Sequence, residues 1–336
     1  MEGKQLSHKE RMQACLEGSE ADRPPVALWR HFPVDDQAPD TLAAATLEFQ
    51  RTFDFDFVKV SPASSFATKD WGVRDEWQGD PEGTRSYTQR VIDRSSDWEK
   101  LPVLGPDQEF LAAQIAALRL IVGEIGPDTP VIQTIFNPLA QAKNLAGKER
   151  LLVHMRRYPE ALHAGLRIIA ETTRRFIEAA IETGIAGVFY AVQHAQYGLL
   201  SEQEYLEFGR QYDLQVLEPA KNLWLNVLHL HGTEVMFSTV LKGRDGDQPL
   251  PVQVVNWHDR ETAPMLNEAQ ELFSGTVCGG LRTEQMVLGA PDDVREEARQ
   301  AINVTGGKRF VLGTGCVIPI ITPYGNIVAA RRAVEA

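Results

Sequence analysis

Cysteine is scarce in this sequence. Its 336 residues include three cysteines, Cys15, Cys278 and Cys316, an odd number spread far apart. Disulfide frameworks use a denser and even set, so this pattern indicates a protein of a reducing compartment. The first residues, MEGKQLSHKERMQ, are polar and charged and show no secretory signal. We therefore expect a cytoplasmic protein in which none of the cysteines forms a disulfide.

Long apolar runs and an excess of positive charge are absent as well. No apolar stretch approaches the roughly 18 residues of a membrane span, so we expect no membrane insertion. Lysine and arginine number 34 against 46 aspartates and glutamates, which gives a formal net charge of −12. Nucleic acid is not an expected partner, because phosphate backbones are bound by basic surfaces. A small anionic substrate stays compatible with this balance, since local arginines or lysines are enough to bind it.

Short apolar runs alternate with amphipathic helical stretches along the whole chain. Helical spacing of apolar residues marks the segments 159–183 and 291–302. Eight such alternations in about 300 residues favour a (β/α)8 TIM barrel. A doubly wound open sheet is the alternative, weakened because no G-x-G-x-x-G follows the first strand. The predicted strands are Val26–Arg30, Phe57–Val60, Val131–Phe136, Gly187–Tyr190, Asn226–Leu230, Val252–Asn256, Thr276–Gly279 and Phe310–Gly313.

One segment interrupts this alternation. Aromatic and β-branched residues at 71–77 and 87–92 flank a turn-rich stretch, Gly79-Asp-Pro-Glu-Gly83. Such a pattern predicts a β-hairpin inserted after the second strand. Because the sequence contains no low-complexity linker and no internal repeat, we expect one domain over residues 1–336.

Two histidines at the end of the fifth predicted strand are the strongest chemical signal. His229 and His231 are two residues apart, so on a strand their side chains point to one side. Cys316 follows the last predicted strand. If the two strand ends lie close together, two imidazoles and a thiol surround one point, as in a catalytic zinc site with an open fourth position. The alternative is a pair of hydrogen-bonded core histidines; Cys15 and Cys278 are expected to be inert.

Barrel active sites lie at the C-terminal ends of the strands, so other polar residues at these ends are candidates too. They are Arg30, His31, Lys59, Ser61, Asn137, Gln193, His194, Asn256, Trp257, His258 and Arg282.

Several short segments along the chain form a recognisable series in their order and spacing. They are Arg23-Pro-Pro-Val26, Asp56-Phe-Val-Lys59, Asn137-Pro-Leu-Ala140, Met155-Arg-Arg-Tyr-Pro-Glu160, Leu200-Ser-Glu-Gln-Glu-Tyr205, Val255-Asn-Trp257, Cys278-Gly-Gly-Leu281 and Thr305-Gly-Gly-Lys-Arg-Phe310. This series resembles the uroporphyrinogen decarboxylase superfamily along nearly the full chain. The resemblance implies a (β/α)8 barrel, in agreement with the strand pattern.

The superfamily that the chain resembles has two branches with different chemistry. True uroporphyrinogen decarboxylases carry an early motif resembling M-R-Q-A-G-R, whose two arginines bind substrate carboxylates. The equivalent stretch here is Leu28-Trp-Arg-His-Phe-Pro33, in which Arg30 matches the first arginine and nothing matches the second. This departure disfavours a tetrapyrrole with eight carboxylates as the substrate.

The other branch consists of corrinoid-dependent methyltransferases with three zinc ligands, H-x-C-G and a late G-C. This chain is similar at His229 and Cys316, whereas His231 stands where cysteine is usual. An imidazole in place of a thiolate makes bound zinc one charge more positive. The resemblance implies zinc on His229, His231 and Cys316, and methylcobalamin or another corrinoid carried by a partner protein.

The expected activity is therefore methyl transfer between that corrinoid and a small thiol, alcohol or ether. The expected substrate contacts are Arg30, His31, Gln193 and His194, with Asn256 and Trp257 shaping the pocket.

Two alternatives stay open. The first is a metal-free decarboxylase of uroporphyrinogen or a smaller tetrapyrrole, with Asp70 binding the pyrrole N–H groups. The second is a non-catalytic corrinoid- or tetrapyrrole-binding protein. A homodimer is compatible with all three hypotheses, because enzymes of this fold often form dimers.

Overall fold

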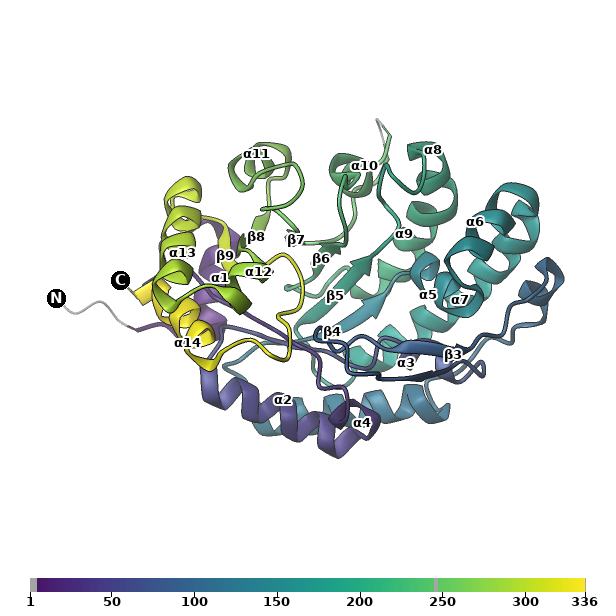
Figure 1. The fold of residues 1–336 in the computed structure, drawn as a ribbon, viewed down its shortest axis with the longest axis horizontal. Helices are drawn as coiled ribbons and strands as arrows, with labels where there is room; N and C mark the ends of the chain where they lie inside the picture. The colour runs from purple at the N-terminus through teal and green to yellow at the C-terminus, as the bar shows by residue number, and fades with distance from the viewer. Residues whose placement is uncertain (1–4, 245–246, 336) are drawn as a thin grey trace.

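A computed structural model describes residues 5–244 and 247–335 of the chain. Seven strands form one parallel sheet in which sequence neighbours are also spatial neighbours, and helices surround it (Figure 1). The strands are β1 (Val58–Val60), β4 (Val131–Phe136), β5 (Gly187–Val192), β6 (Val227–Leu230), β7 (Val254–Trp257), β8 (Thr276–Leu281) and β9 (Phe310–Thr314). Their residues are buried throughout, as expected for parallel strands covered by helices.

The eighth strand position is occupied by the segment around Val26, which forms an isolated parallel bridge with Leu312 of β9. On its other side, the Val26 carbonyl accepts a hydrogen bond of 2.9 Å from the Asp56 amide, just before β1. This segment closes the sheet, so the predicted barrel is confirmed. The predicted strand Val26–Arg30 is much shorter than expected. Its ladder to β9 consists of the Ala27 amide donating to the Leu312 carbonyl at 3.0 Å and the Leu312 amide donating to the Pro25 carbonyl at 2.8 Å, whereas the Trp29 carbonyl accepts from the Ile318 amide in the loop after β9.

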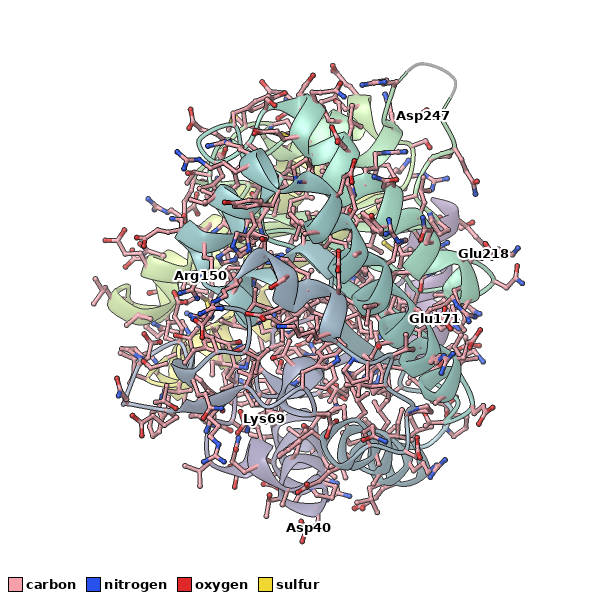
Figure 2. All side chains as sticks on the ribbon, turned by 90° about the vertical axis from the view of Figure 1, so that its right-hand side faces the viewer. Asp40, Lys69, Arg150, Glu171, Glu218 and Asp247 are labelled. Carbon is pink, nitrogen blue, oxygen red and sulfur yellow. The ribbon has the colours of Figure 1, made fainter. Side chains whose placement is uncertain are left out.

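Helices follow the strands and form the outer layer. In Figure 1, α2 and α4 lie together along one edge, and α5 to α9 cover the side behind β4 and β5. Charged side chains such as Glu171 and Glu218 project from this layer (Figure 2). The helices are α1 (His8–Glu17), α2 (Pro39–Phe53), α3 (Phe66–Lys69), α4 (Glu109–Ile125), α5 (Pro138–Ala146), α6 (Lys148–Arg157), α7 (Pro159–Ile181), α8 (Glu202–Tyr205), α9 (Gln211–Leu217), α10 (Phe237–Lys242), α11 (Leu266–Leu272), α12 (Thr283–Leu288), α13 (Pro291–Thr305) and α14 (Tyr324–Arg332).

The long helix α7 shows why the sequence pattern is reliable in this layer. Pro159 occupies its first turn, where a missing N–H costs nothing, and its apolar positions recur at helical spacing. Leu162, Leu166 and Ile169 are fully buried, and α7 packs on the neighbouring helices α5 and α9. Among the helices of the described ranges, none is both long and apolar enough to cross a membrane.

The predicted hairpin is present as β2 (Arg74–Glu76) and β3 (Ser86–Gln89), paired antiparallel after β1. Its tip reaches the loop after β9, where the Ile320 amide donates a hydrogen bond of 2.7 Å to the Pro81 carbonyl. Gly83 lies directly against His31, because a Cβ atom on this glycine would be 2.5 Å from the His31 Cβ. The hairpin therefore packs at the carboxyl end of the barrel.

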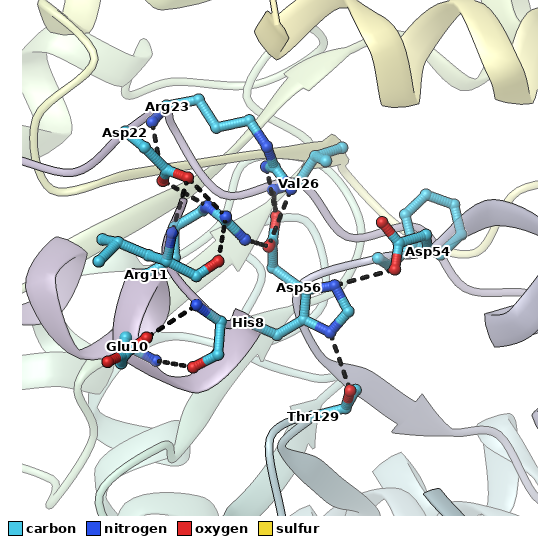
Figure 3. Close-up of polar contacts among 12 residues, drawn as sticks. His8, Glu10, Arg11, Asp22, Arg23, Val26, Asp54, Asp56 and Thr129 are labelled. Atoms are coloured by element: carbon cyan, nitrogen blue, oxygen red, sulfur yellow. Dashed lines mark hydrogen bonds and ion pairs between the residues drawn. The ribbon is translucent and has the colours of Figure 1, made fainter. Parts of the chain in front are cut away.

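An ion-pair cluster fastens helix α1 to the opposite end of the barrel (Figure 3). Asp56 is fully buried and accepts hydrogen bonds from Arg11 at 2.6 Å, from Arg23 at 2.7 Å and from the Val26 amide at 2.7 Å. Arg11 also binds Asp22 at 2.7 Å. One buried carboxylate thus joins α1, the Val26 segment and the start of β1.

Candidate metal and substrate site

Two histidines and a cysteine meet at the carboxyl end of the sheet. The Cys316 Sγ lies 3.8 Å from the His229 Nε2 and 3.7 Å from the His231 Nδ1. All three ligand atoms lie within 4.8 Å of one another. His231 follows β6 and continues its ladder, since its amide donates to the Val192 carbonyl at 2.9 Å. The strand alternation expected for the two histidines is therefore present.

The spacing of these atoms suits a tetrahedral transition metal. In a tetrahedral zinc site with Zn–S bonds of ~2.3 Å and Zn–N bonds of ~2.0–2.1 Å, the sulfur and nitrogen atoms lie about 3.5 Å apart. The observed distances of 3.7 and 3.8 Å need only a small contraction to reach this value. Two imidazoles and a thiol also match the donor types that zinc prefers. The donor set therefore fits a zinc ion with three protein ligands.

A glycine brings Cys316 close to the ends of β6 and β7. A Cβ atom on Gly315 would lie 2.6 Å from the His258 Cα and 3.0 Å from the Trp257 carbonyl oxygen. Such contacts with a rigid backbone would push the loop after β9 outward. Glycine at this position therefore permits the approach of the cysteine to the histidines.

Asn256 fixes the tautomer and the orientation of His229. Its side-chain amide donates to the backbone carbonyls of Cys278 and Thr314, both at 3.0 Å. Carbonyls only accept, so the NH2 group must face them, and the Oδ1 atom faces the His229 Nδ1 at 2.7 Å. The His229 Nδ1 therefore carries the proton and donates it. The lone pair of Nε2 points to Cys316, as a metal ligand requires.

A third histidine, His258, lies beside this group. Its ring centroid is 5.4 Å from that of His231 and 6.3 Å from that of His229. Burial alone would raise the pKa of the Cys316 thiol, but contacts with the three histidines lower that pKa well below its usual value. Burial lowers the pKa of His229. Burial also acts to lower the pKa of His258, but contacts with Cys316 and Glu261 together raise that pKa. This site therefore favours a thiolate.

Below the histidines, the barrel interior holds a lysine between aromatic rings. The Lys59 Nζ is 4.7 Å from the centroid of the Phe189 ring, and this ring also neighbours the stacked His229 ring at 5.2 Å and the Trp29 ring at 5.2 Å. Burial lowers the pKa of Lys59 to about 8. Burial and the Lys59 charge lower the pKa of His31 to about 4, so His31 is neutral near pH 7. Both His31 and Lys59 thus lie near the cluster.

Gln193 and His194 lie after β5, next to a second buried amine. The Gln193 Oε1 accepts a hydrogen bond of 2.9 Å from Lys143. Burial lowers the pKa of His194 to about 3, with smaller contributions from Lys143 and from His231. These contacts place His194 near His231 and keep its imidazole neutral.

Three residues predicted to bind substrate or to shape its pocket have structural partners within the protein. The Asp70 carboxylate accepts from the Phe110 and Leu111 amides at 3.1–3.2 Å and so stabilises the start of α4. The Arg30 guanidinium packs on Phe32 and Phe49, with ring centroids 5.1 and 5.4 Å away. The third, Trp257, faces away from the barrel interior.

Trp257 and Asn256 are adjacent on β7, so their side chains point to opposite faces of the sheet. The Trp257 ring is fully buried against Phe237, and its Nε1 donates to the Pro264 carbonyl at 2.9 Å. Asn256 therefore occupies the inner face and Trp257 the outer one, and a part of Trp257 in shaping the pocket stays a prediction.

Two further polar residues at strand ends also have structural partners. Asn137 caps α5 through the Ala140 amide and donates to Asp213, and Arg282 pairs with Glu297. A surface cavity of about 770 Å³ lies beside Arg282, between α11, α12 and α13. It contains none of the three candidate ligands and lies outside the barrel mouth.

A model of the uroporphyrinogen decarboxylase (URO-D) family matches residues 7–336 of this chain. The chain belongs to the uroporphyrinogen decarboxylase family. Among curated members similar to it, the methylcobamide:CoM methyltransferase MtbA of Methanosarcina mazei is 20% identical over 257 residues, which are 74% of this chain and 70% of MtbA. The methylcobamide:CoM methyltransferase MtaA of Methanosarcina barkeri is 24% identical over 252 residues, 73% of this chain and 70% of MtaA.

Solved structures support the barrel fold. A methyltransferase from Methanosarcina mazei superposes with a TM-score of 0.84 at 18% identity and covers 98% of both chains. A B12-independent methionine synthase from a Shewanella species gives a TM-score of 0.54 at 12% identity, over 93% of this chain and 92% of that one. At these identities, the likeness establishes the fold.

Proposed function

We propose that this protein is a zinc-dependent methyltransferase that moves a methyl group between a corrinoid and a small thiol, alcohol or ether. The observation that carries the proposal is the convergence of His229, His231 and Cys316 at the barrel mouth. The similarity to proteins named methylcobamide:CoM methyltransferases supports a corrinoid as the other reactant.

The residues around the cluster have distinct tasks in this proposal. Zinc held by the three ligands would supply a Lewis acid that lowers the pKa of a methyl acceptor in the open fourth position. Asn256 holds His229 in the tautomer that presents its Nε2 atom. Contacts with the histidines keep Cys316 in the thiolate form that binds a metal. A corrinoid carried by a partner protein would approach from the strand ends, where barrel sites open.

The second histidine sets the charge of the site. With one thiolate and two neutral imidazoles, a divalent zinc keeps one net positive charge, whereas two thiolates would cancel it. A more positive metal acidifies a bound thiol or alcohol more strongly and makes the resulting anion less nucleophilic. We therefore expect His231→Cys to shift the pH dependence of acceptor activation upward.

Metal content of the purified protein tests this proposal directly. We expect about one zinc per chain by mass spectrometry, lost in Cys316→Ser and kept in Cys15→Ser. Cys15 is a suitable control because it is buried away from the cluster, donating to the Phe310 carbonyl at 3.4 Å. The zinc-loaded protein should consume methylcobalamin with a thiol and release the S-methylated product. Protein that stays metal-free when zinc is offered would refute the proposal.

The same purified proteins distinguish the two alternative functions, a decarboxylase and a non-catalytic binding protein. Turnover of uroporphyrinogen without metal would establish a decarboxylase, and a bound chromophore without any product would establish a binding protein. The decarboxylase has less support, because the Asp70 carboxylate caps helix α4.

A further inference from the structure

The turn at the tip of the β2–β3 hairpin carries a carboxylate, Glu82, at the barrel mouth. Both of its chain neighbours are fixed to loops that follow barrel strands. The Pro81 carbonyl accepts a hydrogen bond of 2.7 Å from the Ile320 amide, in the loop after β9. Gly83 lies directly against His31, which follows the short first strand. Glu82 is therefore held between two segments that border the candidate metal site.

The turn is also held by its own hydrogen bonds. The Asp80 Oδ1 accepts from the Glu82 amide at 2.9 Å. The Asp80 carbonyl accepts from the Gly83 amide and from the Trp77 Nε1, both at 3.0 Å. Gly83 has a φ of 79°, a left-handed conformation that glycine adopts without strain. The backbone at Glu82 is therefore positioned without any bond to the Glu82 carboxylate.

The Glu82 carboxylate lies near the candidate metal ligands. Its charge acts on three residues of that group, Cys316, His231 and His258. The charges of Cys316 and of Asp80, which belongs to the same turn as Glu82, also act together on the ring of His31. Interactions of charges exposed to solvent are largely screened beyond about 8–10 Å. The hairpin tip and the ligand group therefore share the barrel mouth.

The Glu82 carboxylate has no partner of its own. Among the residues that the structure describes, none forms a hydrogen bond or an ion pair with its oxygens. The side chain is exposed, so water reaches it. Glu261, a second carboxylate near the ligand group, differs because its Oε2 lies 3.4 Å from the His258 Nδ1. Glu82 is therefore free to take up and release a proton.

The surroundings of Glu82 make its carboxylate a stronger base. Neighbouring protein atoms limit its hydration and raise the pKa of the carboxyl, and the negative charges of Cys316 and Asp80 raise this pKa further. The charges of His231 and His258 act in the opposite direction and do not cancel the rise. A proton acceptor is most effective when its pKa approaches the working pH.

We propose that Glu82 accepts the proton of the thiol or alcohol that the site activates for methylation. This role rests on the proposed function, which requires an ionised methyl acceptor. The S–H or O–H bond breaks, its electron pair stays on the sulfur or oxygen, and the proton moves to a Glu82 oxygen. Because the carboxyl group is in contact with water, it then passes this proton to solvent. The hairpin thus supplies a catalytic group to the barrel mouth.

Two thiols of different acidity test this role. Phenylmethanethiol is protonated at neutral pH and has to lose its proton on binding, whereas 4-nitrothiophenol is already an anion. Stopped-flow spectroscopy of the cobalt(II)-loaded protein follows the arrival of each thiolate through the visible bands of the metal. We expect Glu82→Gln to slow this step about 100-fold for phenylmethanethiol and to leave it unchanged for 4-nitrothiophenol. Methyl transfer from methylcobalamin to the two thiols should show the same difference in kcat/KM.

Glu76→Gln is the matched control. Glu76 is an exposed carboxylate on β2 of the same hairpin, and it accepts a hydrogen bond of 2.7 Å from the Gln78 side chain. This control should react with both thiols as the wild type does. Glu82→Ala with added formate is a second check, because a small carboxylate in the space of the missing side chain should restore part of the rate. A residue that only shapes the hairpin would not be replaced by formate.

The possible results separate this inference from the proposed function. Slow ionisation of phenylmethanethiol in Glu82→Gln, without methyl transfer in any protein, would support the proton acceptor and refute the methyltransferase. Equal rates of Glu82→Gln and wild type with phenylmethanethiol, or an equal loss with both thiols, would overturn the proton acceptor. No binding of either thiol to the metal-loaded wild type at millimolar concentration would refute both. Equal zinc content and an equal melting temperature would show that Glu82→Gln keeps its metal and its fold.

Discussion

Replacing Asn256 by alanine tests how the site holds its metal. Asn256 is fully buried and makes three hydrogen bonds, one to His229 at 2.7 Å and two to backbone carbonyls at 3.0 Å. Without it, the His229 proton moves freely between the two ring nitrogens, and the ring loses its anchor. Loss of such a partner lowers metal affinity about 10- to 100-fold, or about 1.4–2.8 kcal/mol.

Asn226→Ala is the matched control at the other end of β6. Asn226 is equally buried and also makes three hydrogen bonds, with the carbonyls of Ala220 and Pro251 and with the Val188 amide. Both substitutions should destabilise the fold by about 2–5 kcal/mol, because each leaves buried polar groups unsatisfied. Only Asn256→Ala should weaken zinc binding.

Competition with a chromogenic chelator measures the zinc affinity, and urea unfolding measures the stability. Equal zinc affinities for the two variants would refute the proposed role of Asn256. This outcome would mean that the orientation of His229 depends on packing against Phe189 and not on its hydrogen bond.

Two further predictions concern charge and packing. Asp56→Asn should lower the free energy of unfolding by about 3–5 kcal/mol in urea, because Arg11 and Arg23 lose a buried counter-ion. Trp257→Phe should cost about 1–2 kcal/mol in the same assay and leave methyl transfer unchanged, since it removes one buried hydrogen bond outside the pocket.

The features of the site that the sequence predicts are those that depend on the alternation of side chains along a strand. The spacing of His229 and His231 on a strand is enough to place both side chains on one face, and strand order brings Cys316 to the same end of the barrel. The alternation also argues against a pocket role for both Asn256 and Trp257, because adjacent residues cannot share a face. The prediction that used both overlooked this constraint.

Other features depend on contacts between distant segments and leave no local pattern. Asp70 caps a helix that begins 39 residues later, at Glu109, so its partner amides emerge only after α4 has packed. The same holds for the contact of Lys59 with Phe189, because the two residues lie on different strands of the sheet. The short bridge at Val26 was predicted as a full strand, because apolar composition does not reveal how far a ladder extends.

The ligand positions along the chain have a consequence for folding. His229 and Cys316 are 87 residues apart, and β7, β8, β9 and the helices α10 to α13 lie between them. A metal that joins them acts as a cross-link and lowers the conformational entropy of the unfolded chain. For a covalent link that closes a loop of this length, the resulting stabilisation of the fold is about 4–5 kcal/mol. When a chelator removes the metal, the part of the barrel from β6 to β9 should then unfold more readily than the segments that the Asp56 ion pairs join.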